Sequence, residues 1–167
     1  MEILRALSAE RVSVHLAAST RGAALTALSE SFARVDPRLQ PGDLHAAFEA
    51  RERLGHTRVG EACAAVPVRI WELGEPQLSV IVLREPVRCG ASDAQVRILI
   101  GLLGDASDPR AHLRRLRELE RVVGQPGVCE ALADAREQSD VIAVLQLAAL
   151  GGFEAASHDR EPNPRAA

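Results

Sequence analysis

Two strongly apolar runs place the strongest constraint on the fold of this chain. Residues 78–83 and 96–103 are mostly aliphatic and free of proline, with Ser79 and Arg97 as their polar side chains. The second run becomes apolar on both faces toward its end, which is typical of a strand in the middle of a sheet. A third segment, residues 12–16, alternates apolar and polar residues as a half-buried strand does. The chain therefore needs helices to cover a sheet that contains buried strands.

Helical periodicity and capping residues predict helices between these strands. The long helix that starts at Asp108 has proline at its first helical position and glycine just past its end, which is the favoured asymmetry. Strands interleaved with helices predict an α/β domain with helices on both faces. The predicted helices are one that runs to residue 35 after a Ser19 or Thr20 cap, 44–54 after Asp43, 109–123 after Asp108, 128–135, and 138–150.

A length of 167 residues corresponds to a single domain. We expect residues 1–150 to form it and residues 151–167, which carry two prolines, to be a disordered tail. The charged N-terminus does not fit a signal peptide, and the longest uncharged run, residues 141–153, is too short to span a bilayer. Scattered cysteines indicate a reducing compartment. We therefore expect a cytoplasmic protein without membrane insertion.

Composition excludes several functions. All 20 basic residues are arginine, so a Walker A loop and Schiff-base chemistry are ruled out. An aromatic content of 2% and a net charge of -3 argue against nucleic-acid binding. No histidine or cysteine pair has metal-ligand spacing, and His45 with Glu49 is better explained as a solvated helix pair. We expect no metal and no cofactor.

His112 is the histidine with the clearest functional interpretation. It lies in the first turn of the long helix, on the stripe that faces the core. It either satisfies a loop carbonyl at the domain edge or donates a hydrogen bond to a phosphoryl group, because helix starts attract anions. The other stripe of this helix is either a solvated surface or a protein-docking face; its residues are Arg110, Arg114, Arg117 and Arg121.

The most specific pattern follows the second predicted helix. Residues 51–60 read Arg-Glu-Arg-Leu-Gly-His-Thr-Arg-Val-Gly. This stretch resembles the enzyme IIA domains of the bacterial phosphotransferase system, in the fructose/mannitol and nitrogen-regulatory branch. Those domains carry Arg-Glu-x-(Leu/Met)-Gly-Ser-Thr-Gly-(Ile/Val)-Gly and then a strand that ends in Ile-Pro-His. The other collinear matches are Val66-Pro67 at a strand end, Glu85-Pro86-Val87 and Gly90-Ala91 at a turn, Asp93, and His112-Leu113.

The resemblance extends over residues 3–147 and implies a single α/β domain with a mixed central β-sheet flanked by helices on both faces. It also implies that Arg51 and Thr57 bind phosphate and that His112 is a supporting imidazole. His56 replaces the family's serine and adds an imidazole to the loop. On a purely structural interpretation, Arg51 forms an ion pair that holds helix to loop, and His56 is an exposed loop residue.

The departures from the family pattern concern the phospho-acceptor itself. The family's acceptor histidine follows the proline, and the residue in that position here is Val68. Valine has no lone pair with which to attack phosphorus. Residues 60–67 are also one residue longer than the usual pattern, and Arg58 and Ala62 replace two expected glycines. The resemblance therefore implies an acceptor site that has degenerated.

Three functional hypotheses follow. The first is a regulatory protein of the nitrogen-regulatory enzyme IIA type, without phospho-acceptor activity, that binds a histidine phosphocarrier or regulatory target proteins. The second is a phosphocarrier that uses His56 or His112 as acceptor. The third is an anion or small-molecule sensor in which Arg51 and the helix start at Asp108 supply the donors.

Overall fold

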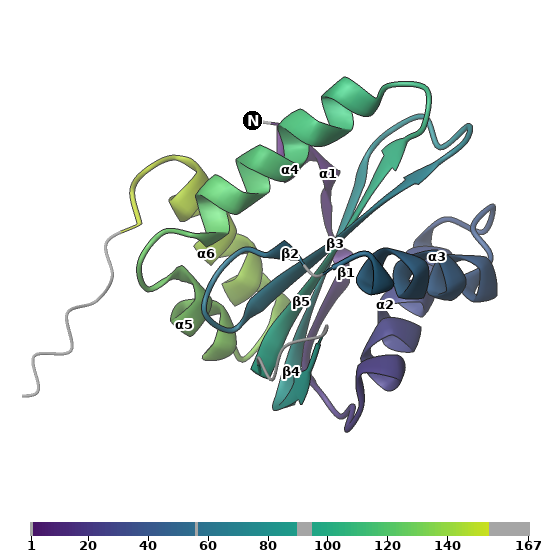
Figure 1. The fold of residues 1–167 in the computed structure, drawn as a ribbon. Coiled ribbons are helices and arrows are strands. Elements are labelled where there is room, and N and C mark those ends of the chain that lie inside the picture. The colour runs from purple at the N-terminus through teal and green to yellow at the C-terminus, as the bar shows by residue number, and fades with distance from the viewer. Residues whose placement is uncertain (1, 56, 90–94, 154–167) are drawn as a thin grey trace, which may run out of the picture.

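A five-stranded mixed sheet, in the order β1-β4-β5-β3-β2, forms the centre of the molecule (Figure 1). The computed structural model describes residues 2–55, 57–89 and 95–153. Strands β1 and β4 are parallel, as are β3 and β5, whereas the β4–β5 and β2–β3 pairs are antiparallel. The strands are β1 (Leu7–Leu16), β2 (Thr57–Arg58), β3 (Cys63–Ile70), β4 (Gln77–Arg88) and β5 (Gln95–Asp105).

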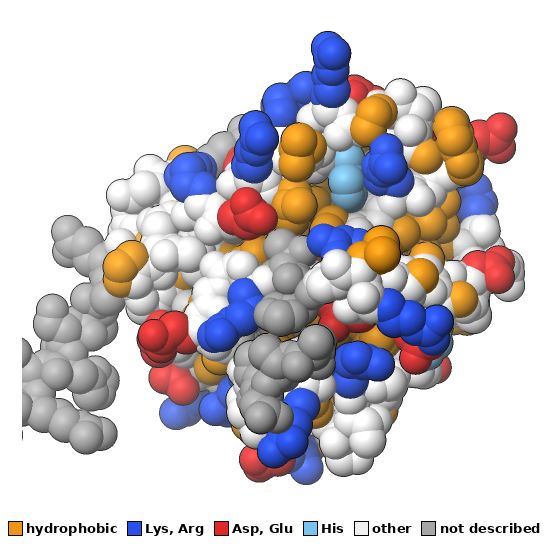
Figure 2. Space-filling model, in the orientation of Figure 1, with side chains coloured by type: hydrophobic (Ala, Val, Ile, Leu, Met, Phe, Trp, Pro, Cys, Tyr) orange, Lys and Arg blue, Asp and Glu red, His pale blue; other side chains and the backbone are white. Residues whose placement is uncertain are grey.

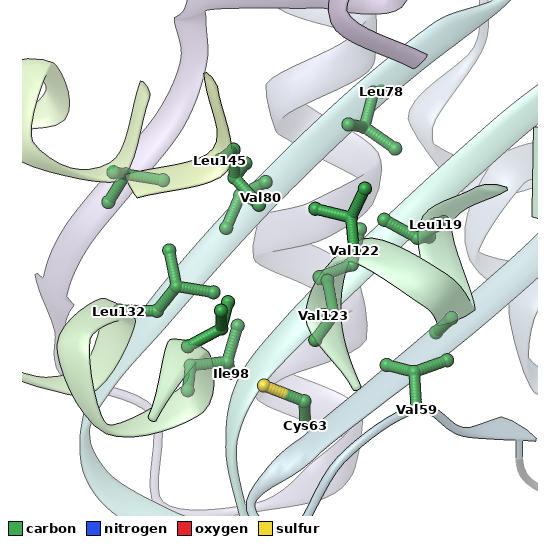
Figure 3. Close-up of a cluster of buried hydrophobic side chains, with 14 of the residues drawn as sticks. Val59, Cys63, Leu78, Val80, Ile98, Leu119, Val122, Val123, Leu132 and Leu145 are labelled. Carbon is green, nitrogen blue, oxygen red and sulfur yellow. The ribbon is translucent and has the colours of Figure 1, made fainter. Parts of the chain in front are cut away.

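Helices cover both faces of this sheet (Figure 1). One face packs against α2 (Arg21–Val35) and α3 (Pro41–Arg53). The other packs against α1 (Glu2–Ala6), α4 (Pro109–Val123), α5 (Val128–Ala133) and α6 (Gln138–Ala149). Each face encloses its own hydrophobic cluster, and Figure 3 shows the one beneath α4, α5 and α6. The predicted α/β fold with a mixed, doubly covered sheet is confirmed. No described helix combines the length and apolar character needed to cross a bilayer.

The capping residues predicted from the sequence begin the two longest helices, and a predicted glycine ends α4. The Thr20 hydroxyl accepts a hydrogen bond from the Ala23 N–H at 3.1 Å, and the Asp108 carboxylate accepts one from the Ala111 N–H at 2.9 Å. Gly124 is the C-cap of α4. The predicted central strand is also confirmed, because β5 lies between β3 and β4.

Two local predictions are wrong. Helix α3 begins at Pro41 after Gln40, so Asp43 lies in its first turn and is not its cap; proline at the first helical position is pre-organised for the helix. The stretch Glu85-Pro86-Val87 is not a turn but part of β4. The β4–β5 register breaks between Val82 and Val87, and such irregularities tolerate a proline that cannot donate to the ladder.

Other expectations concern chain ends and loops. Strand β1 begins at Leu7, earlier than predicted, and α1 was not predicted at all. The expected matches at Gly90, Ala91 and Asp93 lie outside the described residues, as does most of the expected tail of residues 151–167. The structure describes residues 151–153 of that tail, and Phe153 is partly buried against the cluster under α4, α5 and α6.

Strand β1 is an edge of the sheet, and side chains occupy part of that edge. Arg34 donates to the backbone carbonyl of Glu10 at 2.9 Å, and Gln138 donates to the carbonyl of Val12 at 2.9 Å. Natural sheets commonly cover or block edge strands that would otherwise pair with another chain. Here one blocking residue comes from α2 and the other from α6.

Candidate functional site

His112 lies in the first turn of α4, buried against the backbone of β5. A side-chain carbon at Gly104 would lie 2.9 Å from the His112 Cγ and 3.2 Å from its Cβ, and would overlap Nδ1. Only a glycine at position 104 lets the imidazole approach this closely. The Nδ1 atom is buried and has no hydrogen-bond partner in the described parts of the chain.

The surroundings of His112 favour its neutral form. Burial is the largest cause of the lowered pKa of His112, and the positive charges of Arg69 and Arg115 lower it further. A neutral imidazole keeps one ring nitrogen with a lone pair. Because Nδ1 lies against the backbone of β5, Nε2 is the ring nitrogen farther from that strand.

Asp105 joins the loop between β3 and β4 to the loop between β5 and α4. Its Oδ2 accepts a hydrogen bond from the Gly74 N–H at 2.8 Å, and its Oδ1 accepts one from the Ser107 N–H at 2.8 Å. These bonds, with the Ser107 hydroxyl first among them, lower the pKa of Asp105 to about 2. The Ala106 N–H also donates to the Ile70 carbonyl at 2.9 Å. The β3–β4 loop and the β5–α4 loop are therefore held as one unit at this end of the sheet (Figure 1).

This end of the molecule exposes large apolar side chains. Trp71, directly after β3, is 76% exposed, and Leu113, directly after His112, is 47% exposed. Figure 2 shows hydrophobic side chains among arginines over the α4 side of the molecule. The predicted arginine stripe of α4 is exposed along its length, and Arg69 is exposed as well. Apolar side chains surrounded by charge are typical of protein-binding surfaces.

The structure does not bring Val68 and His112 to the same face of the sheet. Val68 pairs with Leu103 in β5 and packs against the cluster under α2 and α3. Side chains alternate along a strand, and Arg69 pairs with Gly104, on which the His112 ring rests. Pro67 and Arg69 therefore share the face of His112, whereas Val68 lies on the opposite face. A one-residue change of length in this strand reverses which residues share a face.

The remaining predicted site residues belong to the loop after α3. Arg51 donates to the Gly55 carbonyl at 2.7 Å, so it ties the end of α3 to the start of the loop. Thr57 lies in β2, where its backbone pairs with Ala65 of β3. His56 lies outside the described residues. His45 and Glu49 form the predicted helix pair, with Nε2 and Oε1 3.6 Å apart. Within the described residues, no cluster of three or more potential ligands could hold a metal ion.

Sequence reasoning missed Trp71, Gly104 and Asp105. Two signals could have found them. The isolated Gly104 in an apolar strand indicates a close approach by another group. Trp71 is the single tryptophan of the chain and follows a strand that ends in an arginine and an isoleucine.

Comparisons with known proteins identify the family of this chain. The sequence matches the family described as the phosphoenolpyruvate-dependent sugar phosphotransferase system, EIIA 2, over residues 5–147. A search of curated proteins gave no significant match.

Solved structures with a similar fold come from the same system. The nitrogen regulatory protein IIA-Ntr from Neisseria meningitidis has a TM-score of 0.78 and 24% identity, over 86% of this chain and 98% of its own. IIA mannitol from Escherichia coli has a TM-score of 0.69 and 23% identity, over 83% and 98%. A chain from the complex of enzyme IIAMtl with phosphorylated enzyme IIBMtl from Escherichia coli has a TM-score of 0.69 and 21% identity, over 84% and 96%. Because the family match covers most of the chain, this protein belongs to the EIIA 2 family of the phosphoenolpyruvate-dependent sugar phosphotransferase system.

Proposed function

We propose that this protein is a regulatory EIIA domain of the nitrogen-regulatory type, which binds other proteins and does not accept a phosphoryl group. One observation carries the proposal. The end of β3, where the family's acceptor lies, reads Val-Pro-Val-Arg-Ile-Trp over residues 66–71. None of these side chains has a nucleophilic lone pair at neutral pH. The conclusion is therefore independent of whether Val68 or its neighbour Pro67 occupies the acceptor position.

The surface around His112 supports a binding role. Trp71 is exposed just after β3 and Leu113 is exposed near the start of α4, and Asp105 holds the β3–β4 loop to the β5–α4 loop, so little ordering is needed when a partner docks. Arg69 and the arginines of α4 surround them. We infer a partner with an apolar patch and an acidic or phosphorylated rim, such as a histidine phosphocarrier or a regulatory target. The complex of the similar IIAMtl with phosphorylated IIBMtl is a precedent for docking onto this fold.

The absence of phosphoryl transfer is tested by mass spectrometry. The protein is incubated with phosphoenolpyruvate, enzyme I and the histidine phosphocarrier, and its intact mass is measured without acid. We expect no added phosphoryl group, which would appear as about 80 Da. A stoichiometric, acid-labile adduct on the wild-type chain would overturn the proposal. The variants Pro67→His and Val68→His are measured in the same assay. Because residue 67 lies on the face of β3 that His112 shares, we expect Pro67→His to accept a phosphoryl group better than Val68→His does.

Binding is tested through the single tryptophan. Since the chain has one tryptophan and no tyrosine, its intrinsic fluorescence reports on Trp71 directly. We expect the emission of Trp71 to change on titration with the phosphocarrier. Leu113→Ala should weaken that binding about tenfold or more if Leu113 is an anchor residue. Leu147→Ala is a matched control, because Leu147 is 50% exposed on α6. Equal effects of the two substitutions would contradict the assigned surface.

A phosphocarrier that uses a different histidine is the second candidate. The lowered pKa of His112 favours it, because the neutral ring keeps a lone pair that can attack phosphorus. His112→Gln and His56→Gln are compared in the same mass assay. An adduct that disappears with one of these substitutions would identify the acceptor and replace the binding-only proposal.

A further inference from the structure

Two cysteines that are far apart in the sequence meet at the opposite end of α4 from His112. Cys63 is the first residue of β3, and Cys129 lies in the first turn of α5. Both are free thiols, and their Sγ atoms are 2.7 Å apart. A disulfide bond is about 2.05 Å long, so a small side-chain movement would join them. Figure 3 shows Cys63 at one edge of the aliphatic cluster beneath α4 and α5.

Of the two cysteines, only Cys129 has any exposed surface. Cys129 is 7% exposed and lines a surface hollow of about 360 Å³, whereas Cys63 is 0% exposed. Gly60 forms another wall of this hollow, and any Cβ at Gly60 would overlap the Cys129 sulfur. A small oxidant therefore reaches Cys129 first, with Cys63 directly behind it.

The pKa shifts of the two thiols also favour reaction at Cys129 before Cys63. Cys63 and the backbone N–H groups of Ala62 and Glu61 lower the pKa of Cys129, because their hydrogen bonds stabilise its thiolate. The shared proton and burial raise the pKa of Cys63. Of the two thiols, Cys129 therefore gives up its proton more readily, and the thiolate is the nucleophilic form.

We propose that Cys63 and Cys129 form a redox modification site, at which a hydroperoxide produces an intramolecular disulfide. The Cys129 thiolate attacks one peroxide oxygen, the O–O bond breaks, and water leaves once the departing oxygen is protonated. Cys129 is then a sulfenic acid. The Cys63 sulfur attacks the Cys129 sulfur, the S–O bond breaks, and the oxygen leaves as water with the Cys63 proton. Two thiols and one hydrogen peroxide thus give one disulfide and two waters.

The bond would act on the segment that carries the family's sequence pattern. Gly60 ends the 51–60 stretch and contacts Cys129, and Cys63 begins the strand that leads to residues 66–71. A disulfide would attach the start of β3 to α5, which have no backbone pairing with each other. Oxidation would therefore restrict the loop between β2 and β3 without altering the surroundings of His112.

The test uses the wild-type chain with hydrogen peroxide as the oxidant. After a stoichiometric dose, the protein is denatured, alkylated with iodoacetamide and weighed, in parallel with a reduced sample. We expect an intact mass about 2 Da lower before alkylation and one alkylated cysteine in place of three, both reversed by dithiothreitol. The oxidised protein should also melt about 5 °C higher or more, because the cross-link closes a long loop.

Matched variants distinguish this pair from the third cysteine. Cys89 lies in the cluster under α2 and α3, so Cys89→Ser should still form the bond, whereas Cys63→Ser and Cys129→Ser should not. In Cys63→Ser, dimedone should trap a sulfenic acid at Cys129. Three alkylated cysteines after peroxide treatment, a covalent dimer, or a bond to Cys89 in the wild-type chain would each overturn the proposal. These wild-type outcomes do not depend on how well the variants fold.

Discussion

At each end of α4, a chemically reactive side chain packs against a glycine. Both contacts lie on the same face of the sheet. At the start of the helix, His112 rests on Gly104; beyond its end, Cys129 rests on Gly60. The last residue of α4 contributes to the second site, since its carbonyl lies 3.6 Å from the Cys129 sulfur. In both places a missing Cβ provides the space for a functional group.

The electrostatic surroundings of the two ends differ. Arg69 and Arg115 lower the pKa of His112, whereas Cys129 faces another thiol and the negative charge of Glu130. The positive charge at the His112 end is the feature on which the proposed docking of an acidic or phosphorylated partner depends. The thiol end has chemistry that does not require phosphate. The comparison teaches that two similar packings against a glycine differ in chemistry because of the charges around them.

Gly104→Ala should have the largest effect among tests of this comparison. The new methyl group would meet the Cγ and Cβ atoms of His112, which cannot move without shifting α4. We expect a loss of about 1–3 kcal/mol in the free energy of unfolding, measured by urea denaturation. Adding His112→Ala should recover much of this loss. Additive effects in the double variant would show that the ring does not depend on the glycine.

Gly60→Ala should have a smaller effect. The methyl group would first meet the Cys129 sulfur, which is the end of a short side chain and can rotate away. We expect a loss of about 1 kcal/mol, again from urea denaturation. With Cys129→Ala in the background, Gly60→Ala should be nearly neutral. If Gly60→Ala and Gly104→Ala lowered the free energy of unfolding equally, the expected difference between the two ends of α4 would be wrong.

The smallest expected effect is the loss of folding stability that the protonation of His112 causes at acidic pH. Its pKa in the folded protein lies below the ordinary value, because of burial and the two arginines. Between these two pKa values the unfolded chain binds a proton that the folded protein does not, so stability falls as the pH drops through the ordinary value of about 6.5. Urea denaturation from pH 8 to pH 5 should show this loss in the wild-type chain and a weaker one in His112→Gln. Parallel pH profiles for the two proteins would contradict it.

Much of the fold could be predicted because its signals are local. The Thr20 and Asp108 caps satisfy backbone N–H groups within three residues, so the sequence near each helix start contains the needed information. The central position of β5 follows from its apolar character on both faces. The short helix α1 carries too few residues for a periodic signal, and it buries only Ile3 and Ala6.

The candidate sites were harder to predict because they depend on distant contacts. Cys63 and Cys129 are separated by 66 residues, and no spacing rule reports that they meet. The face on which Val68 lies depends on strand register, which a single extra residue reverses. The likeness of residues 51–60 to the family pattern identified the loop. Only the packing of His112 on Gly104 shows which face of β3 lies on the side of His112.

The blocked edge of β1 limits how this protein can assemble. Arg34 and Gln138 already satisfy the carbonyls of Glu10 and Val12, to which an incoming strand would have to bind. A second chain cannot extend the sheet there without displacing both side chains, so continuous growth into fibres is disfavoured at high concentration. The proposed docking surface on the α4 side therefore does not compete with sheet extension along β1.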